Sequence, residues 1–199
     1  MKKIIFLALI FIGITTTVQA QKIKFGAKAG MNLASWIGDD IEDGTNMRAS
    51  IHFGILTEFK LNDKFSIQPE VLYSGQGATM KGLYTLTQSY KAAFRFDYIN
   101  VPVMAKYYIV DGFNVEAGPQ VGFLLSSKQM VKTGDVKEVS EFDDKVKNID
   151  FAANLGIGYD LPMGLFFNAR YSFGLTKVND TDEVNIKNRV LSLSVGYKF

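Results

Sequence analysis

The sequence predicts an all-β protein, an eight-stranded antiparallel up-and-down transmembrane β-barrel with short periplasmic turns and long extracellular loops. Three observations predict this fold. Apolar and polar residues alternate over segments of about 10 to 14 residues, as they do in strands with one apolar face. The connections between these segments alternate between short and long. The polar faces are rich in glycine, which suits the narrow interior of an eight-stranded barrel.

The first segment shows the alternation clearly. Residues 23–35 read IKFGAKAGMNLAS, with apolar residues at the odd positions from Ile23 to Leu33 and polar or small residues between them. Seven further segments repeat this two-residue period. The predicted strands are 23–35, 47–59, 65–76, 94–107, 113–125, 150–159, 165–175 and 190–199.

The fourth segment changes the parity of its apolar residues. They occupy even positions over 94–98 and odd positions over 99–107. A shift of one residue moves every side chain to the other face of a strand. We therefore expect a β-bulge or kink between Asp97 and Asn100.

The connections differ in length in a regular way. Three are short, at 61–63, 110–112 and 161–164. Four are long and polar, at 36–46, 77–92, 127–148 and 176–188. Outer-membrane barrels have short periplasmic turns and long extracellular loops. The pattern therefore predicts that both chain ends are periplasmic.

A soluble lipocalin-type barrel has the same period, with its apolar face inside. The membrane alternative is favoured by nearly charge-free apolar faces, by glycine on the polar faces and by aromatic residues near the strand ends. The expected girdle residues are Phe59, Phe65, Tyr107, Phe113, Tyr159, Tyr197 and Phe199 beside the short turns, and Trp36, Tyr73, Phe94, Phe96, Tyr171 and Phe173 toward the long loops.

The N-terminus has the organisation of a Sec signal peptide. Two lysines precede an apolar stretch, and Val18-Gln19-Ala20 resembles a cleavage site. We expect residues 1–20 to be removed, leaving a barrel domain at 21–199. Removal takes away two of the 22 basic residues and none of the 20 acidic ones, so the mature charge is balanced and does not indicate nucleic-acid binding. The chain has no cysteine, which excludes disulfides and lipid attachment through cysteine.

Strand parity places several charged residues inside the barrel. Buried charges need partners, and both signs occur on neighbouring strands, so we expect a salt-bridged polar network that fills the lumen. A path for ions or solutes is the alternative, although open porins use 16 to 18 strands. The predicted network is Arg48, His52, Glu58, Glu70, Lys106, Glu116, Asp150 and Arg170, with Lys24 and Lys28 nearby.

Catalytic and metal sites are weakly indicated. His52 is the sole histidine, and its parity and that of Ser50 point into the lumen, away from any lipid ester, so we predict a lumenal hydrogen bond and no enzyme activity. One histidine and no cysteine argue against a zinc or redox site, and no cofactor is expected. The acidic cluster at 39–43 could bind Ca²⁺ or bridge to lipopolysaccharide, but its spacing is not that of an EF-hand.

Several stretches resemble a known family. They are DYINVPVMAKYY at 97–108, FNVEAGPQVGFLL at 113–125, GIGYDLPMGLFFNARYSFGL at 156–175 and the closing VGYKF. Together they resemble the PorT-like, OmpX-like outer-membrane β-barrel proteins of Bacteroidota, a porin family. The resemblance implies a small barrel of the cell outer membrane, in most cases with no assigned activity. One branch of the family is linked to a secretion machinery, and these motifs do not place the chain on it.

The expected function is therefore that of a non-enzymatic surface protein, whose long loops contact the envelope, surface polymers or other proteins. A narrow pore for ions or small solutes, an envelope enzyme and an accessory to secretion are the alternatives. The expected partners are outer-membrane lipid and lipopolysaccharide, and the outer-membrane assembly machinery during biogenesis. The terminal Phe199, with Tyr197 before it, resembles the C-terminal signal that this machinery recognises.

Overall fold

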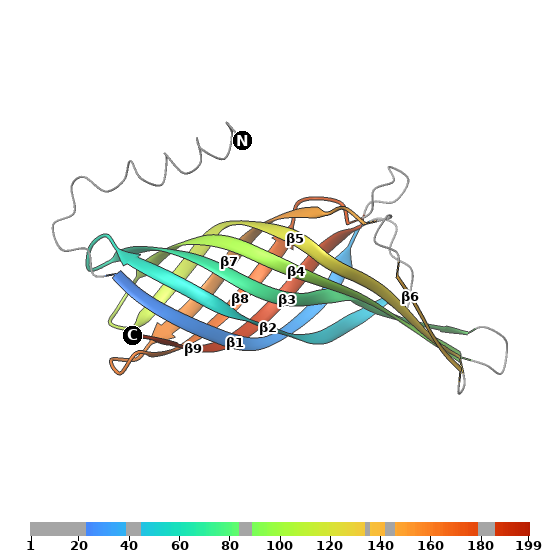
Figure 1. Ribbon diagram of the computed structural model, residues 1–199. Helices are drawn as coiled ribbons and strands as arrows, with labels where there is room; N and C mark the ends of the chain where they lie inside the picture. The colour runs from blue at the N-terminus through green and yellow to red at the C-terminus, as the bar shows by residue number, and fades with distance from the viewer. Residues whose placement is uncertain (1–22, 39–44, 84–88, 134–135, 142–145, 179–185) are drawn as a thin grey trace.

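The computed structural model describes residues 23–38, 45–83, 89–133, 136–141, 146–178 and 186–199. The predicted signal peptide lies outside these residues. Within them, nine strands form one antiparallel sheet (Figure 1). The strands are β1 (Ile23–Ile37), β2 (Thr45–Lys60), β3 (Phe65–Leu83), β4 (Ser89–Tyr108), β5 (Phe113–Thr133), β6 (Val136–Glu141), β7 (Ile149–Asp160), β8 (Leu165–Gly174) and β9 (Lys187–Lys198). No helix among the described residues is long and apolar enough to cross a membrane.

Eight of the strands close into a barrel, and the ninth, β6, pairs only with β5. The ring runs β1-β2-β3-β4-β5-β7-β8-β9, and β9 returns to β1 with Gly26 opposite Lys198 and Ile37 opposite Lys187. The prediction of eight antiparallel strands, the last paired with the first, is confirmed. Closure leaves the barrel without an edge, and each unpaired backbone group in hydrocarbon would cost several kcal/mol.

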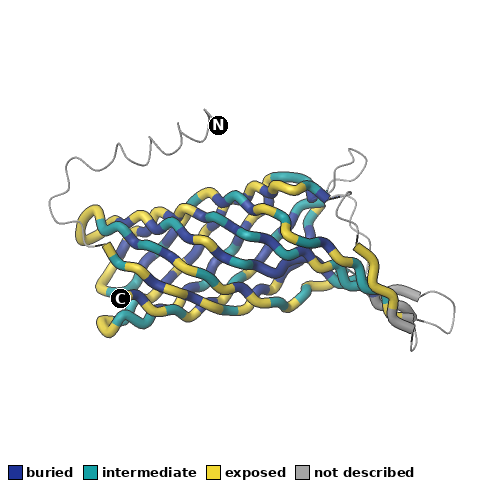
Figure 2. Tube along the Cα trace, in the orientation of Figure 1, coloured by how far each residue is buried: buried dark blue, intermediate teal, exposed yellow. Residues whose placement is uncertain are grey.

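The barrel is apolar outside and polar inside. Along β7 the residues alternate between exposed and buried, with Leu155 and Ile157 58% and 50% exposed and Asn154 buried (Figure 2). The same alternation runs around the wall. A barrel in water buries its apolar face, so this arrangement excludes the lipocalin-type alternative and fits a wall that contacts lipid.

The short turns lie at one end of the barrel, together with both described chain ends (Figure 1). They connect β2 to β3, β4 to β5 and β7 to β8, as predicted. Gly112 and Gly164 adopt positive φ angles of 80° and 95° in two of them. This conformation is unfavourable for residues that carry a Cβ, which explains glycine at these tight turns.

Two of the four predicted long loops consist mainly of strand. In the region 77–92, β3 and β4 remain paired as far as Leu83 opposite Ser89. In the region 127–148, β5 continues to Thr133 and pairs with β6. Both hairpins extend past the barrel at the end opposite the C-terminus (Figure 1). Their sequences lack the apolar alternation because, beyond the membrane, no lipid requires one apolar face.

The parity change in the fourth predicted strand has a different cause from the one expected. The pairing of β4 with β5 does shift by one residue at Asp97 and Tyr98, but the extra residue belongs to β5. β4 keeps its even-numbered residues inside throughout, so Phe96 and Tyr98 are buried in the lumen. The apolar residues of this strand therefore occupy inward-facing positions near Phe96 and Tyr98, because the lumen is lined by apolar side chains in that part of the barrel.

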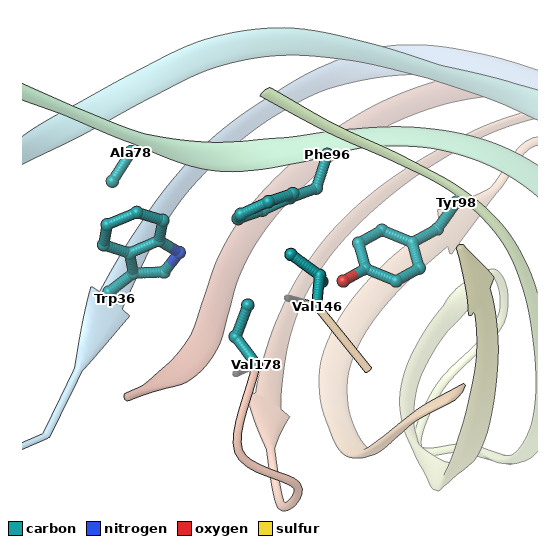
Figure 3. Close-up of a cluster of buried hydrophobic side chains, with 6 residues drawn as sticks. All are labelled: Trp36, Ala78, Phe96, Tyr98, Val146 and Val178. Carbon is teal, nitrogen blue, oxygen red and sulfur yellow. The ribbon is translucent and has the colours of Figure 1, made fainter. Parts of the chain in front are cut away.

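This apolar part of the lumen is a cluster of buried side chains toward the hairpin end, which we term the apolar cap (Figure 3). It consists of Trp36, Ala78, Phe96, Tyr98, Val146 and Val178, with Met80, Phe94, Leu124 and Ile186 packed against it. The Trp36 ring lies 5.0 Å from Phe94 and 5.9 Å from Phe96. The prediction that these three aromatics belong to the outer girdle is therefore wrong. At the short-turn end, Tyr159 and Tyr197 are exposed on the wall as predicted.

Candidate functional site: the charged lumen

Beneath the apolar cap the lumen contains two clusters of ionised side chains. The first, the turn-end cluster, lies nearest the short turns. Lys198 donates to Glu58 Oε2 at 2.7 Å and to Asp160 Oδ2 at 2.6 Å. The Tyr108 hydroxyl contacts the same two carboxylates, at 2.5 Å from Glu58 and 2.8 Å from Asp160. Lys106 Nζ lies 3.6 Å from the other Asp160 oxygen.

The second, central cluster is organised by Arg170. Its two terminal nitrogens donate to the two oxygens of Glu70 at 2.9 and 2.8 Å, and its Nε donates to Glu116 at 2.7 Å. Lys28 lies 2.8 Å from Glu70 on another side. Gln68 donates to Glu70 at 2.7 Å. The cluster links strands from all sides of the barrel, and the bidentate Arg–Glu geometry is a strong form of ion pairing.

The two clusters are balanced in charge. They contain four cations, Lys28, Lys106, Arg170 and Lys198, and four carboxylates, Glu58, Glu70, Glu116 and Asp160. Asp160 is the most exposed of the eight, with 20% of its side chain accessible. Side chains buried this completely can stay ionised because each one has an oppositely charged partner. These eight residues therefore form a neutral plug, without the surplus of one sign that would select ions.

Above the central cluster lies a layer of uncharged hydrogen bonds centred on His52. Its Nδ1 lies 2.8 Å from Asn32 Oδ1, and its Nε2 lies 2.8 Å from Ser194 Oγ. Asn32 Nδ2 donates to Ser74 Oγ at 3.0 Å, which orients the amide and makes Nδ1 the protonated nitrogen of His52. The structure thus places His52 in a lumenal hydrogen-bond network.

The series Ser194, His52 and Asn32 has the order of a hydrolase triad, but its surroundings leave no room for a substrate. All three residues are buried, with 8%, 3% and 1% exposure. The adjoining cavity, which Lys28 and Arg170 also line, measures about 20 Å³. This volume holds a water molecule and no ester. Ser50, the serine considered with His52 from sequence, instead donates to the Gly75 carbonyl at 2.6 Å.

Two predicted members of the network lie apart from the ion pairs, toward the hairpin end. Arg48 is half-buried and donates to the Gln76 carbonyl at 2.6 Å. Asp150 accepts hydrogen bonds from Thr176 and Asn188. Lys24, also expected inside, is half-buried opposite Glu58. The structure therefore places Glu58 and Lys106 in the turn-end cluster and Glu70, Glu116 and Arg170 in the central cluster, and it leaves Arg48 and Asp150 outside both.

Sequence reasoning missed three members of the turn-end cluster. Tyr108 has the inward parity of Lys106, and Asp160 has that of Asn154 on β7, so continued alternation would have included both. Lys198 has the inward parity of Ser194 on β9, but it is not among the predicted network charges. All three lie at strand ends. Turns or girdle residues are expected there, so the inward-facing alternation is not continued to these positions.

The described residues contain no group of three or more metal-ligating side chains that could hold an ion. The acidic cluster at 39–43, a candidate Ca²⁺ site from sequence, lies outside the described residues. The predicted assembly residues are on the outer wall, with Tyr197 51% and Phe199 75% exposed. The Phe199 amide donates to the Phe25 carbonyl at 2.8 Å, so the last residue takes part in barrel closure.

A closed barrel with an apolar outer wall and an ion-paired interior defines a transmembrane β-barrel protein. The family described as outer membrane protein beta-barrel domain matches residues 19–180, and the chain belongs to this family. Membership implies a location in the outer membrane. A comparison with curated proteins gives no match.

Solved structures with the same fold are small bacterial outer-membrane barrels. Ail, the attachment invasion locus protein of Yersinia pestis, is 12% identical, with a TM-score of 0.52 over 88% of this chain and 98% of Ail. A second Ail structure, in complex with the heparin analogue sucrose octasulfate, is 13% identical, with a TM-score of 0.53 over 89% and 99%. Neisserial surface protein A is 15% identical, with a TM-score of 0.51 over 90% and 100%. At these identities the likeness establishes the fold alone.

Proposed function

We propose that this protein is a non-enzymatic outer-membrane barrel that presents its hairpins and loops at the cell surface for contacts with the envelope or with surface molecules. The observation that carries the proposal is the sealed lumen. A neutral ion-paired plug and an apolar cap fill the barrel, so no described path leads through it. The parts that extend into water are the hairpins at one end, and exposed segments on a rigid scaffold are the usual places for recognition.

The proposal includes an orientation. The short turns and both ends of the mature chain face the periplasm, and the connections at 36–46, 77–92, 127–148 and 176–188 face outward, as in other outer-membrane barrels. Residues 1–20 act as the signal peptide, and N-terminal sequencing of protein from outer membranes should begin at Gln21. Tyr197 and Phe199 serve as the assembly signal.

The comparisons support a surface role without defining its ligand. Ail is named for attachment and invasion, and one of its structures contains a heparin analogue. These properties belong to Ail, and they support the proposal that the outward end of this barrel makes its contacts. The motifs at 97–108, 113–125 and 156–175 support a place for this chain among the PorT-like, OmpX-like barrels of Bacteroidota. A role as a secretion accessory has no structural observation in its favour.

Single-cysteine labelling on intact cells tests the orientation. The natural chain has no cysteine, so each engineered one is unique. Val139→Cys lies on β6 of the extended hairpin, and Asp63→Cys lies in a short turn; both positions are exposed. A membrane-impermeant maleimide should label Val139→Cys on intact cells, whereas Asp63→Cys should react only after permeabilisation. The reverse pattern would refute the proposal.

Planar-bilayer recording tests the sealed lumen. The purified protein should give no stable conductance on the nanosiemens scale, because the cavity among the central polar residues holds about 20 Å³. A steady open channel would refute the plug and favour the narrow-pore alternative. Heat-modifiability on a gel confirms that the barrel is folded in each preparation.

A further inference from the structure

The outer wall of the barrel is hollowed near the short turns. A groove of about 310 Å³ lies on the outward faces of β7, β8 and β9, beside the start of β5. We term it the wall groove. Its volume is at the lower end of the range of small-molecule pockets, and it is far larger than the lumenal cavity of about 20 Å³. The outward-facing residues that line it are Phe113, Ile157, Tyr159, Phe167, Ala169 and Leu193.

The strand register explains why the wall is hollow at this place. Ile157 is opposite Ala169, and Ala169 is opposite Leu193, so a single methyl group lies between two longer side chains. Phe167, two residues before Ala169 on β8, faces the same side of the sheet and borders the hollow. The neighbouring row offers only backbone to the groove, because its members lack a side chain or direct it into the lumen. They are Gly158, Asn168 and Ser194.

The chemistry of the wall groove selects a hydrocarbon ligand. Its outward-facing side chains are apolar apart from the hydroxyl group of Tyr159, and none of its lining residues is charged. Pockets for polar ligands have a few polar groups that converge on the ligand, and the residues of this groove provide no such set. Apolar cavities also stay free of water. A hydrocarbon chain is therefore the chemistry that matches the groove.

The wall groove is continuous with the surface that contacts lipid. Ile157 and Leu193 are 50% and 55% exposed, as are other residues of the outer wall. Phe113 is the first residue of β5 and is opposite Tyr159, which is one residue from the end of β7. Tyrosine residues collect where a membrane meets water. The groove therefore begins near this boundary and continues along the wall toward Ala169, in the direction of the membrane interior.

We propose that the wall groove binds one acyl chain of a membrane phospholipid. The chain enters beside Tyr159 and lies over Ala169, between Ile157 and Leu193. An unfilled hollow in hydrocarbon forfeits the dispersion contacts of its lining, and close packing is a main source of association inside membranes. The headgroup then lies on the short-turn side. Its assignment to the periplasmic leaflet rests on the proposed orientation, whereas the binding of the chain does not.

A second copy of the protein fits the wall groove less well than a lipid chain. A stable protein–protein interface buries about 1,200 to 2,000 Å². The groove extends over two rows of outward-facing residues and could supply only a small part of such an area. An acyl chain needs no further contacts, because lipid already surrounds the whole wall.

Filling the groove with a side chain tests the proposal. Ala169→Phe places a ring where the acyl chain is expected, and the new side chain is apolar and faces lipid, so the barrel should still fold. Ala153→Phe is the matched control. It makes the same change at an exposed position of β7, opposite Pro119 and Phe173, outside the groove. Ala169→Leu fills the groove in part and replaces the first variant if that one does not fold.

The measurement uses full-length protein folded in phosphatidylcholine vesicles that contain some phosphatidylcholine with a photoreactive diazirine on one acyl chain. After illumination, mass spectrometry of peptides locates the lipid adducts. The adducts should be several-fold more frequent around Ile157, Phe167 and Leu193 than on the outward faces of β1 and β2. Ala169→Phe should remove this excess, and Ala153→Phe should keep it.

Even labelling around the wall, or equal effects of the two variants, would overturn the proposal. Sedimentation in detergent micelles tests the alternative occupant. A dimer that Ala169→Phe converts to a monomer would show that a second copy fills the groove and would overturn the acyl chain as its ligand.

This experiment and the labelling of cysteine variants on cells fail independently. Even crosslinking would remove the acyl-chain site and leave the surface role intact. If Val139→Cys is inaccessible on cells, the headgroup belongs to the opposite leaflet, and the crosslinking pattern in vesicles still decides whether the groove binds a chain.

Discussion

Replacing Arg170 with methionine removes three charge-assisted hydrogen bonds from the centre of the lumen and keeps a long unbranched side chain. Glu70 loses its bidentate partner, and Glu116 loses a 2.7 Å contact with Nε. Lys28, 2.8 Å from Glu70, is then the cation that remains in direct contact with Glu70. Removing one partner of a buried ion pair costs about 3 to 5 kcal/mol. We expect the free energy of unfolding to fall by that amount.

The assay is guanidinium unfolding of the protein refolded in phospholipid vesicles. Trp36 is the single tryptophan and is buried in the apolar cap, so its fluorescence reports opening of the barrel. Arg95→Met makes the same chemical change at an exposed position and should stay within about 0.5 kcal/mol of the wild type. A stability loss below about 1 kcal/mol for Arg170→Met would refute the view that this residue organises the plug.

A second variant keeps the test valid if Arg170→Met does not fold. Adding Glu116→Gln to it removes one carboxylate and restores equal numbers of cations and carboxylates in the two clusters. Refolding yield and unfolding midpoint should both recover in part. No recovery would indicate that the loss comes from packing around residue 170 and not from unbalanced charge.

Three further outcomes follow from the structure. Deleting Phe199 should lower the amount of the protein in the outer membrane. Its stability in detergent should change by only about 1 kcal/mol, since one backbone hydrogen bond to Phe25 is lost. Normal membrane levels on quantitative blotting would contradict this prediction. Gly196→Ala should destabilise the barrel by about 1 to 3 kcal/mol in the same unfolding assay. The new Cβ would lie 2.3 Å from the Phe166 ring and 2.6 Å from a backbone oxygen. A variant as stable as the wild type would disprove this close packing. Trp36 should emit at short wavelength and resist quenching by iodide, whereas ready quenching would mean that the apolar cap is open to water.

Strand parity determined most of the inward and outward assignments correctly. Glu58, Glu70, Glu116 and Arg170 are buried where alternation placed them, because a β-strand sends successive side chains to opposite faces whatever the rest of the fold does. The same local rule would have found Asp160 had it been continued to the strand end.

The rule failed where the surroundings of the strand changed along its length. Phe96 is predicted to lie in the outer girdle because apolar residues are expected to point outward. The lumen is apolar at that level, which depends on segments around Val146 and Val178 that approach from other parts of the chain. The hairpins beyond the barrel are predicted as loops, because a strand in water needs no apolar face and therefore shows no alternation.

The sequence by itself determined a closed eight-stranded barrel, its short turns and a polar interior that contains Glu58, Glu70, Glu116 and Arg170. These follow from a two-residue period and from the requirement that no backbone edge be left in lipid. Only the tertiary structure decided which charge meets which. Arg170 and Glu70 are separated by 100 residues, and Lys198 and Glu58 by 140, and they pair because closure brings their strands around a common lumen. Alternation gives the face of a strand, whereas the partner across the sheet or the lumen depends on how all the strands are staggered together.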